Sequence, residues 1–254
     1  MSEMPRREFL KSSLVASSAL WLPTIGSIGY GAPAPGIERR APALATAEER
    51  LRQPDIWVME VVLRPLRQIR VNLPDPKTGA TTERLVWYLC YRAINRLITV
   101  KTSPNELPPS DKALAARTQV FVPEFTLVTD DNGEQKRYID RVMPAAQPII
   151  NKRERGEYKN SIEIVGPLPP AVPEGKPGTE ILGVATWRGV DPTADRFRIF
   201  MTGFSNGYEV TKGPNDEEIV LRKTLVQEYW RPGDELQQDE REIRAEGDPK
   251  WIYR

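Results

Sequence analysis

The sequence contains no histidine and only one cysteine, Cys90. The lack of histidine excludes Ser-His-Asp and Cys-His hydrolases, and it removes nearly all zinc, copper and haem sites. A single cysteine excludes an intrachain disulfide, iron–sulfur clusters and thiolate zinc clusters. Neither a P-loop nor a G-x-G-x-x-G motif occurs. We therefore expect no cofactor and no transition-metal site.

The chain also lacks an excess of charge, since 36 Lys and Arg residues face 35 Asp and Glu residues. This balance gives no electrostatic footprint for nucleic acid or an anionic membrane surface. The length of 254 residues suits one large or two small domains, and 39% hydrophobic residues is close to the globular average. The 24 prolines disfavour long helices.

The N-terminus carries a basic head followed by a weakly apolar stretch, residues 12–31, that contains no charge. This order is typical of a secretory signal. The head resembles the twin-arginine export motif and departs from it only at Pro5, where Ser or Thr is expected. The matching residues are Arg6, Arg7, Phe9, Leu10 and Lys11. The serines, glycines and proline of the apolar stretch make it a poor membrane span.

These features predict three regions. Residues 1–34 form the signal segment, 35–54 an Ala/Pro-rich leader, and 55–254 the folded body. Processing is expected between Gly31 and Ala47, without a defined site. The mature chain would then have no integral membrane span and would lie in the periplasm or outside the cell.

The body shows short apolar runs that alternate or are apolar on both faces, separated by turn residues, which predicts strands. The expected strands cover residues 56–63, 68–73, 85–94, 118–128, 137–142, 161–165, 181–187, 196–204 and 218–230. Hairpin turns are expected at 131–133 and 205–207, and a short helix at 144–150. With no alternation of strands and helices, the pattern predicts a mainly β fold, an antiparallel β-sandwich, immunoglobulin-like or similar, with long Pro-rich loops.

Several of these runs resemble those of an uncharacterised family of exported bacterial proteins. They are residues 87–92, 122–128, 183–187 with 195–197, 203–207 and 251–254. The similarity extends from about Trp57 to the last residue. It implies export, and it implies no activity, cofactor or catalytic residue.

Few residues remain as candidates for chemistry. Cys90 lies in an apolar strand, so we expect a buried, inert thiol. A carboxylate pair is the one enzyme type still permitted, with Asp130, Asp131, Asp191 and Asp195 as candidates, although all four adjoin turn residues. Residues 130–134 and 215–218 present oxygen ligands that could hold calcium, but a solvated turn is the favoured interpretation.

Five tryptophans lie in the body. We expect Trp57, Trp87 and Trp187 in the core, and Trp230 and Trp251 as candidates for a surface aromatic binding site. The sequence thus favours a non-enzymatic binding or structural protein of the cell envelope, with an envelope protein or polysaccharide as partner. The alternative is a carboxylate-based hydrolase acting on envelope polysaccharide. The oligomeric state stays open.

Overall fold

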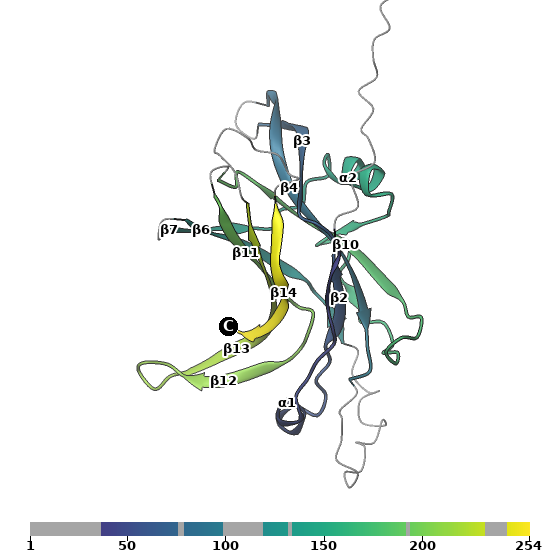
Figure 1. The fold of residues 1–254 in the computed structure, drawn as a ribbon, viewed down its shortest axis with the longest axis vertical. Coiled ribbons are helices and arrows are strands. Elements are labelled where there is room, and N and C mark those ends of the chain that lie inside the picture. Colours follow the sequence, from purple (N-terminus) through teal and green to yellow (C-terminus); the bar gives the residue numbers. More distant parts are fainter. Residues whose placement is uncertain (1–36, 76–78, 99–118, 132–133, 192–193, 232–242) are drawn as a thin grey trace, which may run out of the picture. The chain divides into compact units, whose positions relative to one another are not determined.

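The computed structural model describes residues 37–75, 79–98, 119–131, 134–191, 194–231 and 243–254 (Figure 1). The signal motif from Arg6 to Lys11 lies outside these residues, so the export signal stays a prediction. None of the helices in the described ranges has the length and apolarity needed to cross a membrane.

The first sheet has six strands with β4 at its centre. Its members are β1 (Arg39–Ala41), β2 (Met59–Leu63), β3 (Arg67–Pro74), β4 (Thr81–Asn95), β8 (Lys159–Asn160) and β10 (Glu180–Arg188). β2 and β3 pair with successive halves of β4, and β10 pairs with it as well. All pairs are antiparallel except β8 with β10. Burial on both faces of β4 confirms the central strand predicted at 85–94.

The second sheet also has six strands, in the order β12-β13-β11-β6-β7, with β14 paired to β13. They are β6 (Glu124–Asp131), β7 (Glu134–Ile139), β11 (Arg196–Thr202), β12 (Tyr208–Lys212), β13 (Glu218–Trp230) and β14 (Arg244–Tyr253). Asp131 pairs with Glu134, which confirms the first hairpin. The remaining elements are the short β5 (Val120–Phe121) and β9 (Gly166–Pro167), and helices α1 (Ala47–Arg52) and α2 (Gln147–Glu154).

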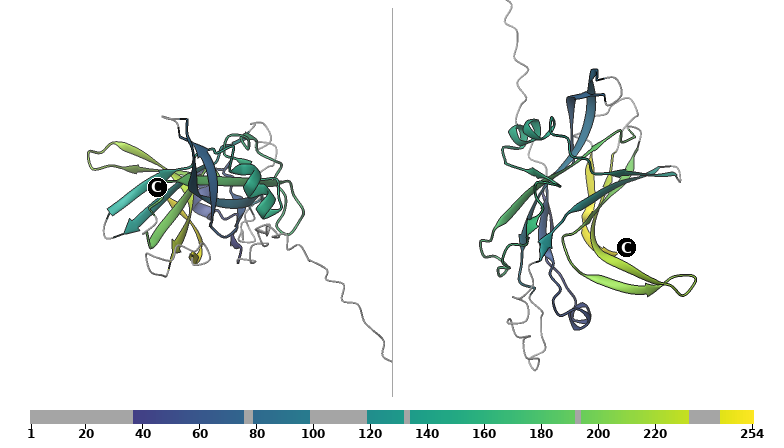
Figure 2. Two further views of the ribbon diagram at one scale, coloured as in Figure 1. Left: turned by 90° about the horizontal axis from the view of Figure 1, so that it is seen from above. Right: turned by 180° about the vertical axis from the view of Figure 1, so that it is seen from behind.

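The two sheets pack face to face around one hydrophobic core, which confirms the β-sandwich (Figure 2). Phe204 lies among three aromatic rings of this core, with centroids 5.2 Å away at Tyr91 and Phe121 and 5.7 Å away at Phe125. These edge-on contacts add to the burial of apolar area. The core positions predicted for Trp57, Trp87 and Trp187 are confirmed.

A second, smaller core lies on the other face of the first sheet and includes Ile150 of α2 and Ala146, the residue before that helix. Cys90 and Tyr88 of β4 point into it. Cys90 is fully buried, as predicted, and burial raises the pKa of its thiol well above the ordinary value. The helix expected at 144–150 forms a few residues later, as α2.

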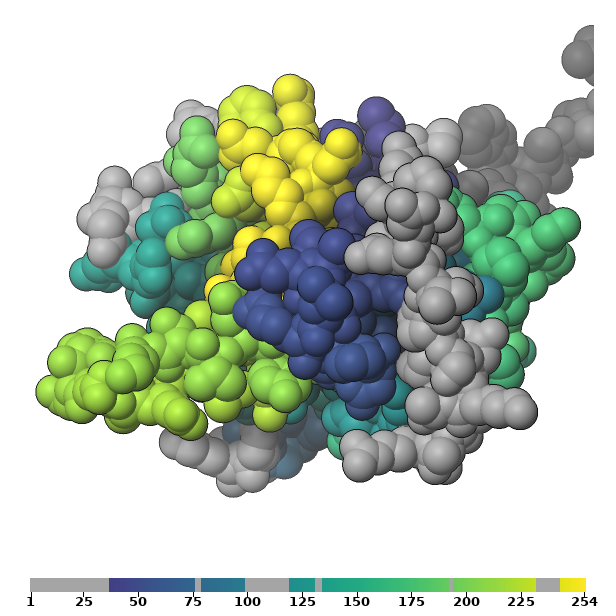
Figure 3. Space-filling view, turned by 90° about the horizontal axis from the view of Figure 1, so that it is seen from below, coloured from purple at the N-terminus to yellow at the C-terminus, as the bar shows by residue number. Residues whose placement is uncertain are grey.

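The range assigned to a leader contains β1 and α1, both attached to the body. Thr46 caps α1 with a capping box. The Thr46 hydroxyl accepts a hydrogen bond from the Glu49 N–H, and the Glu49 carboxylate accepts one from the Thr46 N–H. That carboxylate also accepts hydrogen bonds from Lys223 at 2.6 Å and from Tyr253. In Figure 3 the blue N-terminal part of the body lies against both the yellow C-terminal segment and the yellow-green segment.

The strand predicted at 161–165 is wrong, because these residues form a turn. The side-chain oxygen of Asn160 accepts from the N–H groups of Ile162 and Glu163, both at 3.0 Å. Its backbone carbonyl accepts from Ile164. An asparagine at this position therefore closes the chain on itself and prevents a strand ladder.

The second hairpin, predicted at 205–207, is also wrong. β11 and β12 do not pair with each other, since both pair with β13. The Asn206 side chain instead binds the chain before β2, accepting from the Trp57 N–H at 2.7 Å and donating to the Asp55 carbonyl at 3.0 Å. Asn-Gly here joins the two sheets and does not form a two-residue hairpin turn.

Candidate anion-binding groove

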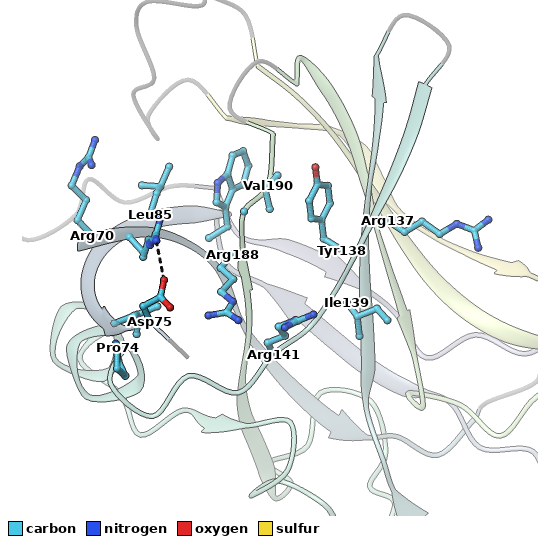
Figure 4. A pocket seen from close by; sticks show the side chains of 14 residues that line it. Arg70, Pro74, Asp75, Leu85, Arg137, Tyr138, Ile139, Arg141, Arg188 and Val190 are labelled. Atoms are coloured by element: carbon cyan, nitrogen blue, oxygen red, sulfur yellow. Dashed lines mark ion pairs between the residues drawn. The ribbon is translucent and has the colours of Figure 1, made fainter. Parts of the chain in front are cut away.

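A groove with a volume of about 730 Å³ opens between three parts of the fold (Figure 4). One wall is the hairpin formed by β3 and β4, another is β7 with the chain that follows it, and the third is the end of β10. Its described lining contains five arginines and one aspartate, namely Arg70, Arg84, Arg137, Arg141, Arg188 and Asp75. The groove is therefore strongly cationic.

The chain crosses between the sheets at this groove. Asp140 donates its N–H to the Phe125 carbonyl in the second sheet at 3.0 Å, and Arg141 donates its N–H to the Thr186 carbonyl in the first sheet at 2.9 Å. Arg188 follows Thr186 by two residues in β10, so both side chains lie on one face. Both arginines line the groove, and the view of Figure 4 draws their exposed side chains next to each other.

The Asp140 carboxylate fixes this crossing. It accepts hydrogen bonds from the Thr186 N–H at 2.7 Å and from the Ser161 hydroxyl, while Thr186 donates its own hydroxyl to the Arg141 carbonyl. Burial raises the pKa of Asp140 above its ordinary value, and the hydrogen bonds from Ser161 and Thr186 oppose that shift. These contacts hold the backbone of Arg141 and leave its side chain facing solvent.

The arginines differ in how far their charge is balanced. Arg84 lies 3.9 Å from Asp75, and Arg70 lies 3.6 Å from Glu83, both in exposed or half-exposed pairs that hold little energy. Arg141 and Arg188 form no ion pair with any residue that the structure describes. These two guanidinium groups line the groove without a counter-charge among the described residues, and each can donate two hydrogen bonds to a carboxylate, sulfate or phosphate.

Arg137 belongs to the rim, because Figure 4 shows its side chain directed away from the groove. It faces the outer surface of the second sheet, where Arg254 lies. Burial, together with repulsion from Arg137 and Arg198, lowers the pKa of Arg254. Arg137 therefore places its charge near Arg254 and Arg198, outside the groove.

The groove also has apolar lining residues, of which Leu85 and Tyr138 are half buried, whereas Trp87 and Val190 belong to the buried core beneath them. Tyr138 is half buried, and its hydroxyl accepts a hydrogen bond from the Asp191 N–H at 3.2 Å. The Trp87 indole N–H is buried without a hydrogen-bond partner in the described part of the chain. An aromatic and aliphatic wall facing guanidinium groups suits a ligand that combines an anionic group with a carbon ring.

Two of the carboxylates named from the sequence are held in ion pairs with basic side chains. Asp130 binds Arg198 at 3.1 Å and Asp191 binds Lys136 at 2.9 Å. Asp195 accepts a backbone hydrogen bond at its carbonyl from Arg231, and the side chain of Asp131 is outside the described set. Asp75 is the only carboxylate among the described lining residues.

The two loops named for calcium show no ligand cluster among the residues described. The first loop is only partly covered, because residues 132–133 fall outside the structure's description. In the second, Asp216 binds Lys212 at 2.6 Å, and the Glu217 carboxylate accepts from the Asn215 N–H at 2.8 Å. Within the described ranges, no three acidic or Cys side chains come together to hold a metal ion.

The two tryptophans named for a surface site lie on opposite faces of the second sheet. Trp251 pairs with the core residue Leu225, packs against the core and donates its indole N–H to the Pro42 carbonyl at 3.0 Å. Trp230 faces outward, half buried, with Arg244 5.6 Å from its ring centroid. They do not form one joint platform.

Sequence reasoning missed the arginine groove. Its charged members are scattered from residue 70 to residue 188 and come together only through strand pairing and the crossing at Asp140. Single arginines at outward strand positions are common, so none of them signals a site on its own.

The comparisons with known proteins add no precedent. No family model, curated protein or solved structure matches this chain.

Proposed function

We propose that this protein is a non-enzymatic, exported binding protein of the cell envelope, and that its groove binds an anionic polysaccharide. The observation that carries the proposal is that Arg141 and Arg188 both line the groove and form no ion pair with any residue in the described part of the chain. Guanidinium groups bind carboxylate and sulfate groups through paired hydrogen bonds.

A polysaccharide fits better than a free inorganic anion. The groove is lined by the partly exposed apolar side chains of Leu85 and Tyr138, which an inorganic ion without carbon would not contact favourably. Sugar rings present apolar faces that pack on aromatic side chains, while their acidic substituents would reach the arginines. Many weak contacts of this type suit a long, repeating ligand.

The alternative, a carboxylate-based hydrolase, requires two acids about 5–10 Å apart across the bond to be cleaved. Asp75 has no such partner among the described residues of the groove, and it lies 3.9 Å from Arg84. Among the described lining residues Asp75 is the only acid, so we favour binding without turnover.

A titration tests this function. The purified protein is titrated by calorimetry with an acidic oligosaccharide, such as oligogalacturonate, and with a neutral oligosaccharide of equal length. We expect the acidic ligand to bind at least about tenfold more tightly at low salt, because attraction between unlike charges is strong there. The advantage should shrink at high salt. Equal affinities for the two ligands would contradict an anion-binding groove.

The proposal that the protein is exported rests on the N-terminal twin-arginine-type motif. Replacing Arg6 and Arg7 by lysine keeps the positive charge but removes the guanidinium pair that the twin-arginine motif requires. The precursor should then accumulate in the cytoplasm, as followed by cell fractionation. The matched control is replacement of Arg39 and Arg40 by lysine, which should leave export unchanged. Normal export of the first variant would refute the assignment to this pathway.

A further inference from the structure

A second groove, with a volume of about 560 Å³, adjoins the arginine groove. One of its walls is the start of α2 with the chain before that helix, and the other is the turn that follows Asn160. Arg141 lines the arginine groove, and the next residue, Val142, lines this second groove. Glu163 is the only charged residue in its described lining, so the two grooves differ sharply in charge.

Hydrogen bonds between side chains fix the polar part of the second groove. The Gln147 side chain donates to the Glu163 carboxylate at 2.7 Å and accepts from the Asn160 amide at 2.8 Å. Asn160 is itself buried. The hydrogen bond from Gln147 holds the pKa of Glu163 below its ordinary value, so the carboxylate is ionised near neutral pH and can only accept. These groups are therefore in place before a ligand binds.

Two polar groups of this lining have no partner among the described residues. Oδ1 of Asn151 accepts from the Tyr158 N–H at 3.1 Å, which sets the orientation of the amide and leaves its Nδ2 without an acceptor. One oxygen of Glu163 accepts from Gln147, and the other accepts from no described group. The groove thus offers a free donor on α2 and a free acceptor on the turn.

The lining also has exposed apolar surface. Ile162 is 73% exposed, and Pro144 and Pro148 are exposed as well. A ligand that uses the whole groove therefore needs a hydrogen-bond acceptor, a hydrogen-bond donor and a small apolar group close together. The acetamido group of an N-acetylated sugar has this composition, with one carbonyl, one N–H and one methyl.

We propose that the second groove binds the acetamido group of an uncharged N-acetylated sugar, and that the polysaccharide ligand alternates such sugars with acidic ones. Asn151 donates to the acetamido carbonyl, Glu163 accepts from its N–H, and the methyl packs against Ile162. This inference rests on the proposed function, because the arginine groove supplies the site for the acidic sugar. The step from Arg141 to Val142 places the two sites next to each other, as neighbouring sugars require.

A peptide presents the same amide group, so the adjoining groove decides between the two ligands. Its partly exposed Leu85 and Tyr138 suit the apolar face of a sugar ring, and its arginines suit an acid carried on that ring. The sugar is therefore the ligand that uses both grooves, and a peptide becomes an outcome of the test.

The test compares two acidic ligands by calorimetry on the full chain. One is a hyaluronan oligosaccharide, in which glucuronate alternates with N-acetylglucosamine, and the other is oligogalacturonate with the same number of carboxylates. Glu163→Gln keeps an oxygen that accepts from Gln147 and turns the free acceptor into a donor. We expect this change to weaken hyaluronan binding at least about fivefold and to leave oligogalacturonate binding within about twofold.

The sign of this effect separates a lost contact from general electrostatics. Removing a negative charge alone strengthens the binding of either anion, so weaker binding identifies a direct contact. The matched control is Glu157→Gln, which removes an exposed carboxylate from the same loop outside the groove and should not weaken the binding of either ligand. Hyaluronan binding that Glu163→Gln leaves unchanged would overturn the inference, while tighter binding of both acids than of neutral sugars would still support the proposed function.

A neutral ligand gives a readout that does not depend on the arginines. Di-N-acetylchitobiose, which carries no charge, should shift the NMR signal of the Asn151 side-chain NH2 in the wild-type protein. The absence of this shift would overturn the inference, as would an equal shift caused by trialanine, which would indicate a peptide groove. If the signal shifts but neither acid binds, the function proposed for the arginine groove fails and the acetamido site stands.

Discussion

Replacing Glu49 by glutamine should lower the free energy of unfolding by about 3 kcal/mol. The Glu49 carboxylate and the Lys223 ammonium are 2.6 Å apart, with side chains only 7% and 5% exposed. Glutamine keeps the acceptor of the capping box, so the change isolates the charge. It leaves the ammonium buried with the Leu44 carbonyl as its remaining acceptor outside residue 49. Denaturant unfolding measures the effect.

Two controls accompany this prediction. Asp216→Asn breaks an exposed ion pair with Lys212, keeps a side chain that tolerates the positive φ of 64°, and should cost no more than about 0.5 kcal/mol. Glu49→Gln combined with Lys223→Met removes both buried charges, and should be less destabilised than the single change. A single variant as stable as the wild type would show that the buried pair does not stabilise the attachment of α1.

The effect of Glu49→Gln should also depend on pH. Burial alone raises the pKa of Glu49, but hydrogen bonds from Lys223 and Tyr253 outweigh it and hold the pKa below its ordinary value. A carboxyl with a depressed folded pKa stabilises the fold above its unfolded pKa, and that stability is lost as the pH falls through the folded value. The difference between wild type and Glu49→Gln should therefore shrink below about pH 4.

Replacing Gly203 by alanine should destabilise the protein by about 3–4 kcal/mol. Gly203 has a φ of +84°, and a Cβ at this residue would lie 1.9 Å from the Val122 carbonyl oxygen. A left-handed backbone alone costs an alanine about 1–2 kcal/mol. The clash adds to this cost, because the Val122 carbonyl oxygen is a backbone atom and cannot rotate away as a side chain could. The melting temperature should fall by roughly 10 °C.

Gly247→Ala is the matched control for Gly203→Ala. Gly247 has a φ of +66°, and no atom lies within 4 Å of its added Cβ. It should therefore show only the backbone contribution, about 1–2 kcal/mol. If both variants were equally stable, the close approach between the end of β11 and Val122 would not be a determinant of the fold.

The sandwich could be predicted because its strands have strong local patterns. The strand predicted at 218–230 matches β13 residue for residue, since its branched and aromatic side chains extend over the whole run. The turn at 131–133 was also visible, because β6 and β7 are adjacent and need no distant partner. Local chemistry and long-range pairing agree at these positions.

The rest depends on contacts between distant residues. Asn206 has the composition of a hairpin turn, yet its side chain binds Asp55 and Trp57, about 150 residues away. The turn after Asn160 is the exception, because local hydrogen bonds to Ile162, Glu163 and Ile164 close it, and the prediction there followed the apolar pattern of the run. The groove shows the same limit, because Arg141 reaches Arg188 only through the crossing at Thr186. No short window of sequence contains the partners of Asn206 or brings the arginines of the groove together.

The most direct test removes the two arginines of the groove that have no counter-charge among the described residues and measures the affinity for the ligand. Arg141→Gln with Arg188→Gln removes them, and both side chains are exposed, so the melting temperature should not change. The control is Arg50→Gln in α1. Helix α1 lies at the opposite end of the folded body from the β3–β4 hairpin (Figures 1 and 2).

The measurement is the calorimetric affinity of the two variants for the acidic oligosaccharide. Each charge-assisted contact should contribute about tenfold, so the double variant should bind about 100-fold more weakly, and the Arg50 variant should bind within about twofold of wild type. A double variant that binds the acidic oligosaccharide as tightly as the wild type would contradict the assignment of this groove as the binding site.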